Sequence, residues 1–201
     1  MFHVPLKSIT RCAGRSTGRY LVNNNVGKMW LSTESGSGMY DKLAFIGTGK
    51  MVQAMIKPLV QNGYQPEEKI AIYDVSNTSM KGVKKDLPNI DVAQSIEEAA
   101  TDADMIVCAV KPQNINTEFW EQFPKKLRED ATLLSILAGT PVKAFAPSGI
   151  KKIVRSMPNT PATIGEGMTV WCCTPNLTAE ERDRVKQVLC SFGKTVSFIC
   201  A

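Results

Sequence analysis

Histidine is nearly absent from this sequence. The single histidine of the 201-residue chain is His3, so residues 41–201 contain no imidazole. For that stretch, this excludes a Ser-His-Asp triad, a Cys-His pair and a zinc site with histidine ligands. The chain also lacks an apolar run long enough to cross a bilayer as a helix. We therefore expect no membrane partner.

Paired cysteine motifs are also lacking. The six cysteines include no Cys-x-x-Cys spacing, so they predict neither a zinc site nor a dithiol redox centre. Cys172 and Cys173 are adjacent and would point to opposite faces of a strand, where they cannot bridge each other easily. We expect reduced thiols, typical of an intracellular protein, and no metal.

Net positive charge is small over most of the chain, although the whole chain carries +5. Residues 1–40 hold five basic residues and one acidic residue, which leaves only +1 for residues 41–201. A nearly neutral body lacks the basic surface that attracts phosphate backbones. We expect no nucleic-acid partner.

The basic N-terminal segment, residues 1–40, is rich in serine, threonine, asparagine and glycine. Its arginines at 11, 15 and 19 are spaced by four, and it lacks the apolar centre of a secretory signal. This composition predicts a transit peptide. The alternatives are a plain disordered tail or an over-extended translation start. The prediction is an organellar protein, with a mitochondrion favoured over a plastid, and a cytoplasmic one if the tail is not a transit peptide.

Residues 41–201 alternate between strand and helix patterns. The expected strands cover residues 43–46, 69–74, 90–93, 104–110, 132–137, 152–155, 168–172 and 195–199. The expected helices cover residues 51–59, 79–85, 116–126 and 178–191, with a further one that begins at the Ser95 capping box. Such alternation predicts one α/β domain: a Rossmann-like, doubly wound, mostly parallel sheet with helices on both faces.

A glycine turn follows the first strand. Gly47 and Gly49 allow a tight turn, and the helix that follows aims its N-terminal amides at the same point. Such a turn binds the pyrophosphate of a dinucleotide. Val52 replaces the third small residue of the usual Gly-x-Gly-x-x-Gly/Ala pattern, so a turn without a ligand is the alternative.

Four more features fall at the carboxyl ends of the expected strands, where doubly wound sheets bind ligands. They are Asp74, residues 109–112, residues 135–139 and the proline- and glycine-rich loop 155–169, which contains Asn159 and Thr160. Taken alone, that loop is also consistent with a purely structural role.

Together these segments resemble the N-terminal domain of the pyrroline-5-carboxylate reductase family. The matching pieces are Phe45-Ile-Gly-Thr-Gly-Lys-Met51, Ala109-Val-Lys-Pro112, Ser135-Ile-Leu-Ala-Gly139, Met157-Pro-Asn-Thr-Pro161 and Gly165-x-Gly167-Met168. The resemblance implies NAD(P)H-dependent reduction of a small imino acid, 1-pyrroline-5-carboxylate, to L-proline. A hydroxyacid-dehydrogenase-like enzyme fits less well, because Met157 to Pro161 does not suit it.

The resemblance also implies roles for individual residues. The cofactor would contact Ile46, Gly47, Thr48, Gly49, Lys50, Met51, Ala109, Val110, Lys111, Pro112, Ile136, Leu137 and Ala138. Asn159 and Thr160 would lie on the substrate side. Lys111 could act as an acid or a Schiff-base lysine, but the family pattern favours backbone contact to the cofactor. No catalytic side chain is assigned.

Asp74 bears on the choice of cofactor. It ends a strand 25 residues after Gly49 (74 minus 49), where a carboxylate can take the ribose hydroxyls of NAD. Family members that use NADP resemble one another in having serine or a basic residue about here. Ser76, Asn77 and Thr78 could offset the repulsion of a phosphate. The sequence therefore leans to NADH and leaves NADPH open.

The chain stops at Ala201, where the resemblance implies a further helical domain that holds the imino acid and builds the dimer. We expect a truncated reductase, for which oligomerisation is doubtful. The alternative is a non-catalytic dinucleotide-binding module derived from this family.

Overall fold

The computed structural model describes residues 39–199. The predicted transit peptide lies outside the described residues, apart from its last two positions. Met39 and Tyr40 belong to the fold: the Tyr40 ring is buried, and its backbone exchanges hydrogen bonds with the buried Gln65 amide (3.1 and 2.8 Å). The folded domain therefore begins at or before residue 39.

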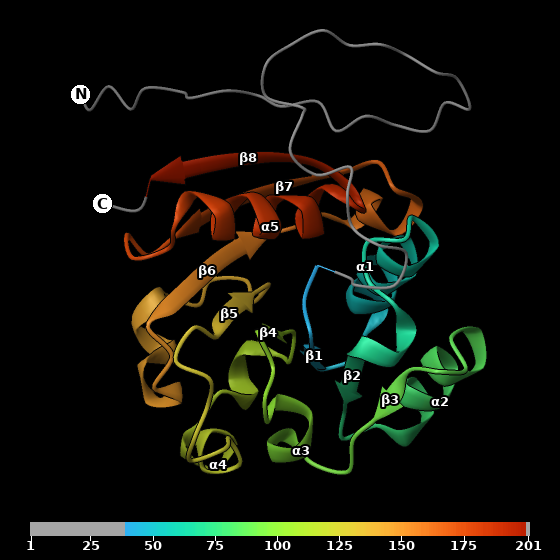
Figure 1. Ribbon diagram of the computed structural model, residues 1–201, viewed down its shortest axis with the longest axis horizontal. Coiled ribbons are helices and arrows are strands. Elements are labelled where there is room, and N and C mark those ends of the chain that lie inside the picture. Colours follow the sequence, from blue (N-terminus) through green and yellow to red (C-terminus); the bar gives the residue numbers. More distant parts are fainter. Residues whose placement is uncertain (1–38, 200–201) are drawn as a thin grey trace, which may run out of the picture.

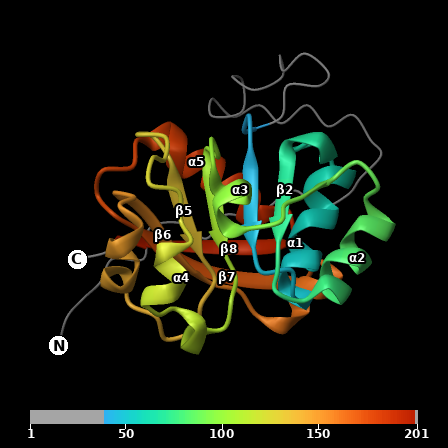
Figure 2. The same ribbon diagram turned by 90° about the horizontal axis from the view of Figure 1, so that it is seen from below.

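A twisted eight-stranded sheet forms the centre of the domain. Its order is β3-β2-β1-β4-β5-β6-β7-β8. The strands are β1 (Leu43–Ile46), β2 (Ile70–Tyr73), β3 (Asp91–Val92), β4 (Met105–Cys108), β5 (Thr132–Ser135), β6 (Lys152–Met157), β7 (Gly167–Cys173) and β8 (Gly193–Ile199). In Figure 2, β7 and β8 run across the direction of β1 and β2, which shows how strongly the sheet twists.

Helices cover both faces of the sheet (Figure 1). One hydrophobic cluster joins the sheet to α1 (Lys50–Gln61), α2 (Asn77–Asp86) and α5 (Ala179–Cys190). A second cluster, on the other face, joins it to α3 (Ile96–Ala100) and α4 (Thr117–Glu121). Every residue of β1, β4 and β5 is buried, as expected of strands covered on both sides. The predicted fold class is confirmed.

One departure from the predicted elements has a clear cause. The helix expected over residues 116–126 ends at Glu121, because Pro124 cannot donate a helical hydrogen bond and disfavours helix before it. The sheet is mostly parallel, as predicted: β7 runs antiparallel to β6, and β8 then pairs in parallel with β7. No α-helix lies between β6 and β7; the chain turns back through the short 3-10 helix η4 (Thr160–Ile164).

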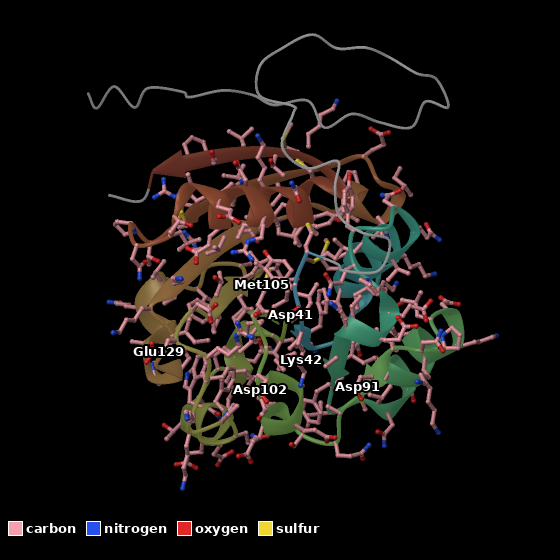
Figure 3. All side chains as sticks on the ribbon, viewed as in Figure 1. Asp41, Lys42, Asp91, Asp102, Met105 and Glu129 are labelled. Atoms are coloured by element: carbon pink, nitrogen blue, oxygen red, sulfur yellow. The ribbon has the colours of Figure 1, made fainter. Side chains whose placement is uncertain are left out.

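The amino-terminal ends of the parallel strands β1 to β6 form the edge away from the predicted site. Figure 3 labels Asp41 and Lys42 before β1, Asp91 at β3, and Met105 at the start of β4. Lys42 donates its ammonium to the carbonyl oxygens of Glu98 and Thr101 (3.0 and 2.8 Å). These bonds tie the start of β1 to the end of α3.

The cysteines differ in part from the expectation of reduced thiols. Cys108 and Cys173 are free, whereas Cys172 and Cys190 each take part in a disulfide. The expectation is therefore wrong for the latter two. Over the described part of the chain, we found no helix with the length and apolar character needed to cross a membrane.

Candidate dinucleotide-binding site

Strand register brings the predicted site segments to one edge of the sheet. Ile46 at the end of β1 pairs with Tyr73 of β2 and Cys108 of β4, and Cys108 pairs with Ser135 of β5. These four residues form one row across parallel strands. The residues that follow them, from Gly47, Asp74, Ala109 and Ile136 onward, therefore leave the sheet side by side.

The glycine turn is held against its neighbours by backbone. Gly47 has φ +100°, and its N–H donates to the carbonyl oxygen of Tyr73 (2.7 Å). The N–H of Ala109 donates to the carbonyl oxygen of Ile46 (2.8 Å). A Cβ on Gly47 would lie 2.7 Å from the Ala109 carbonyl oxygen. Only glycine fits both this conformation and this close approach.

The N-terminus of α1 differs from those of the other α-helices. Ser76, Ser95, Asn116 and Thr178 cap α2, α3, α4 and α5 with side-chain oxygens. Gly49 caps α1 without any side-chain hydrogen bond, and the first turn of α1 holds no acidic residue. The first amides of α1 and the helix dipole thus favour an anion. A Cβ on Gly49 would meet nothing within 4 Å, so the space above this residue is open.

Asp74 lies beside the glycine turn. Its Oδ2 accepts hydrogen bonds from the backbone N–H of Thr48 (2.6 Å) and from the Thr48 hydroxyl (3.0 Å). Its Oδ1 accepts one from the backbone N–H of Ser76 (2.8 Å). Asp74 therefore lies at the predicted site, with most of its hydrogen-bonding capacity directed at the protein itself.

The segments that follow β4 and β5, residues 109–112 and 136–138, reach the site in different ways. Lys111 and Pro112 are exposed, as is Ala138, while Ala109, Val110 and Ile136 are half-buried. Leu137 is only 2% exposed and packs in the cluster that includes α3 and α4. Because its side chain is buried in that cluster, only its backbone can reach a ligand.

The proline-bracketed loop follows β6 at the same edge. The Asn159 Oδ1 accepts a hydrogen bond from the Met168 N–H (2.9 Å), which closes the loop between β6 and β7. Thr160 is exposed at the start of η4, and buried Ala162 joins η4 to the cluster that contains α1. Asn159 thus has a structural role, and Thr160 lies close to the α1 side of the site.

Within the part of the chain that the structure describes, this edge offers no nucleophilic thiol. Cys108 ends β4 directly before Ala109, but burial raises its pKa to about 12 despite a hydrogen bond from the Val110 backbone. The thiol stays protonated at neutral pH and cannot act as a thiolate nucleophile.

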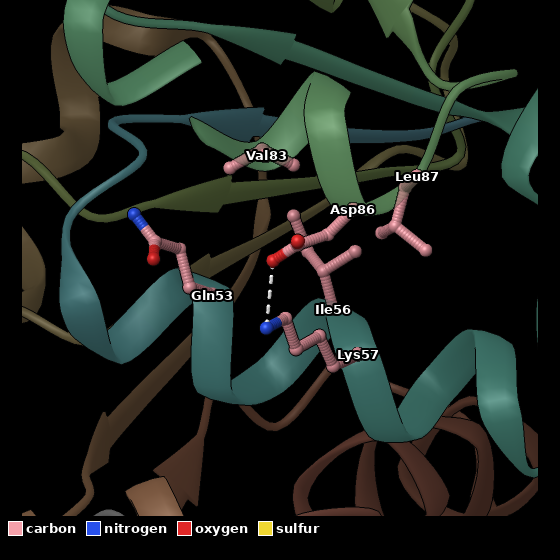
Figure 4. Close-up of a pocket in the computed structure, with 6 residues that line it drawn as sticks. All are labelled: Gln53, Ile56, Lys57, Val83, Asp86 and Leu87. Atoms are coloured by element: carbon pink, nitrogen blue, oxygen red, sulfur yellow. Dashed lines mark ion pairs between the residues drawn. The ribbon is translucent and has the colours of Figure 1, made fainter. Parts of the chain in front are cut away.

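Sequence reasoning missed Gln53. Its side-chain amide donates to the Thr48 carbonyl oxygen (3.0 Å) from within the first turns of α1. Figure 4 shows Gln53 on α1, beside a small pocket between α1 and α2 that the Lys57–Asp86 ion pair crosses (2.7 Å). No motif marks this glutamine, because its partner is a backbone atom set by the path of the turn.

The sheet, the glycine turn and the uncapped start of α1 define a Rossmann-type nucleotide-binding domain. A family model described as "NADP oxidoreductase coenzyme F420-dependent" matches residues 42–139. Pyrroline-5-carboxylate reductase of Haemophilus influenzae is 36% identical over 159 residues, covering 77% of this chain and 56% of that protein.

Solved structures show the same fold. Pyrroline-5-carboxylate reductase from Coxiella burnetii superposes with a TM-score of 0.68 at 23% identity, over 80% of this chain and 59% of that one. The Plasmodium falciparum pyrroline carboxylate reductase, solved with NADP bound, gives 0.64 at 28% identity, over 78% and 57%. The chain belongs to the pyrroline-5-carboxylate reductase family and covers its N-terminal domain. It spans between half and two thirds of the length of these relatives.

Proposed function

We propose that this chain binds a reduced nicotinamide dinucleotide and supplies the cofactor half of a reductase that converts 1-pyrroline-5-carboxylate to L-proline. The observation that carries the proposal is the N-terminus of α1: no side chain caps it, and the space beside its N-cap residue, Gly49, is open. Family membership adds the substrate class, because the relatives are named for this reaction.

The residues at the sheet edge fit such a cofactor. Gly47, Gly49 and the first amides of α1 would hold the pyrophosphate. The exposed backbone at Lys111, Pro112 and Ala138 would line the path toward the ribose and nicotinamide. When bound, the cofactor supplies the hydride; the chain supplies the binding surface and its orientation.

The contribution of this chain to the reaction is to position the cofactor relative to the imine. Hydride transfer to a protonated imine needs close, oriented reactants and exclusion of water more than a strong base. The absence of histidine from residues 41–201 is compatible with that chemistry. Thr160, exposed at the start of η4, is the polar side chain we place nearest the substrate. Lys111 contacts the cofactor through its backbone.

The second candidate is a dinucleotide-binding module without catalysis. It is favoured because the described residues provide the binding edge of the sheet but no side chain to which we assign catalysis. Both candidates require the same binding site and differ only in turnover.

We propose that the chain by itself is monomeric or weakly associating, which light scattering during size-exclusion chromatography measures directly.

Calorimetry and a steady-state assay of the purified 201-residue chain test the proposal. We expect binding of NADH that is tighter than binding of NADPH. With pyrroline-5-carboxylate and excess NADH, we expect a trace of the rate of a full-length relative, because a misplacement of about 1 Å can cost roughly a hundredfold. Robust proline formation would show that this chain suffices for catalysis. Failure to bind either nucleotide would overturn the site.

We also propose that the chain is organellar, with a mitochondrion favoured over a plastid. Support comes from the arginines at 11, 15 and 19 and the scarcity of acidic residues before residue 40. Residues 1–38 fused to a fluorescent protein should direct it to the organelle, and a variant with these three arginines changed to glutamine should stay in the cytosol. Cytosolic fluorescence from the unaltered fusion would refute the transit peptide.

A further inference from the structure

Thr48 is the most tightly held residue of the glycine turn. It is fully buried, yet each of its polar groups has a partner from another element. Its N–H and hydroxyl both donate to the Asp74 Oδ2 (2.6 and 3.0 Å), and its carbonyl oxygen accepts from the Gln53 amide (3.0 Å). The turn is thus fixed from the β2 side and from the α1 side.

Asp74 is itself held in one orientation. The N–H of Ser76 donates to Oδ1 (2.8 Å), while Oδ2 is directed at Thr48. A carboxylate has about four acceptor positions, and three are used by these bonds. Bonds from N–H and O–H donors to an ionised carboxylate are among the stronger ones in proteins. One position on Oδ1 remains for any ligand.

We propose that Asp74 is a positioning residue: its carboxylate joins the turn after β1 to the turn after β2 and holds the amides at the start of α1 in their binding arrangement. This role rests on the proposed dinucleotide site and is separate from contact with a ribose. A turn shaped before the ligand arrives loses less conformational freedom on binding, so both NADH and NADPH bind more tightly.

The matched variant is Thr48→Val, which keeps the shape of the side chain and the charge of Asp74 but removes one of the three bonds. We expect the Kd values of NADH and NADPH to rise together, by about fivefold to tenfold, with their ratio unchanged. If Asp74 acted only on the ribose, this substitution would leave both Kd values at the wild-type level, and that result overturns the proposal.

A second measurement needs no nucleotide. Amide hydrogen exchange of Thr48, whose N–H donates to Asp74, should be at least about tenfold faster in the free 201-residue chain of Asp74→Ser than in wild type. Asn77→Asp is the control, because it adds a charge at the exposed first residue of α2 without changing these bonds, and its Thr48 exchange rate should match wild type. Circular dichroism confirms that each variant is folded.

The two measurements separate the two proposals. Unchanged exchange at Thr48 in folded Asp74→Ser overturns the positioning role and leaves the cofactor site intact. Faster exchange in a chain that binds no nucleotide overturns the proposed function, while the bonds between the two turns stand. Faster exchange together with parallel losses of NADH and NADPH affinity in Thr48→Val supports both.

Discussion

Gly47 and Ala109 meet through backbone alone: a Cβ on Gly47 would lie 2.7 Å from the Ala109 carbonyl oxygen. The turn after β1 therefore fits against the turn after β4 only while residue 47 has no side chain. Gly49, two residues further on, has open space where its own Cβ would lie. The two glycines serve different purposes, one for folding and one for access by a ligand.

This difference can be tested with a pair of substitutions. Gly47→Ala should lower the free energy of unfolding by about 2 kcal/mol or more, because it combines a positive φ with a backbone clash. Gly49→Val should leave stability nearly unchanged yet abolish NADH binding, because its side chain would enter the space over α1. Urea denaturation and calorimetry measure the two effects. Unchanged affinity in Gly49→Val would show that no ligand approaches this turn.

The order of the elements could be predicted because parallel buried strands leave a clear signal. Runs such as Leu43–Ile46 and Met105–Cys108 are continuously apolar; Gly47 directly follows the first, and Pro112 lies shortly after the second. Once the strands are parallel, their carboxyl ends must share one edge. The predicted gathering of Gly47, Asp74, Ala109 and Ile136 follows from that topology.

The remaining features depend on contacts that no local pattern encodes. The antiparallel pairing of β7 with β6 depends on how the loop from Asn159 to Met168 closes. The bonds from Thr48 to Asp74 join residues 26 positions apart. The packing of Tyr40 depends on Gln65, which reads as an ordinary polar loop residue until the fold brings the two together.

The charge of Asp74 should set the cofactor preference. A carboxylate about 4 Å from a phosphate costs about 4 kcal/mol per unit charge at an effective dielectric near 20. We therefore expect Asp74→Ser to shift the ratio of the NADH and NADPH dissociation constants by about tenfold or more toward NADPH, or about 1.4 kcal/mol. NADH affinity itself should fall, because the bonds to Thr48 are lost. A ratio that stays constant would mean that Asp74 does not face the ribose.

Truncation should reveal where the folded domain begins. Removing residues 1–38 should leave the melting temperature unchanged. Removing residues 1–40 should cost about 3 kcal/mol, because it deletes the buried Tyr40 ring and the two hydrogen bonds that the Gln65 amide, 1% exposed, makes with the Tyr40 backbone. Tyr40→Ala retains the backbone bonds and separates the ring from them. Equal stability of both truncated chains would contradict the role given to Tyr40.

Glu181 should make stability depend on pH. Burial raises its pKa, but hydrogen bonds from the Lys152 ammonium and the Thr178 backbone outweigh burial, so the pKa lies below the ordinary value of 4.5. Because the folded-state pKa is the lower one, the stabilisation is complete above the unfolded-state pKa. It is lost as the pH falls through the folded-state pKa.

We expect Glu181→Gln to lower the free energy of unfolding by about 1–2 kcal/mol at pH 7, since it removes the ion pair with Lys152 and weakens the capping box at Thr178. The difference from wild type should shrink as the pH drops below 4.5. Glu180→Gln, one residue earlier and exposed, is the control and should change little at either pH. Urea denaturation at a series of pH values measures all three proteins. A Glu181→Gln deficit that persists once the carboxyl is protonated would show that lost packing, rather than the lost charge, causes the destabilisation.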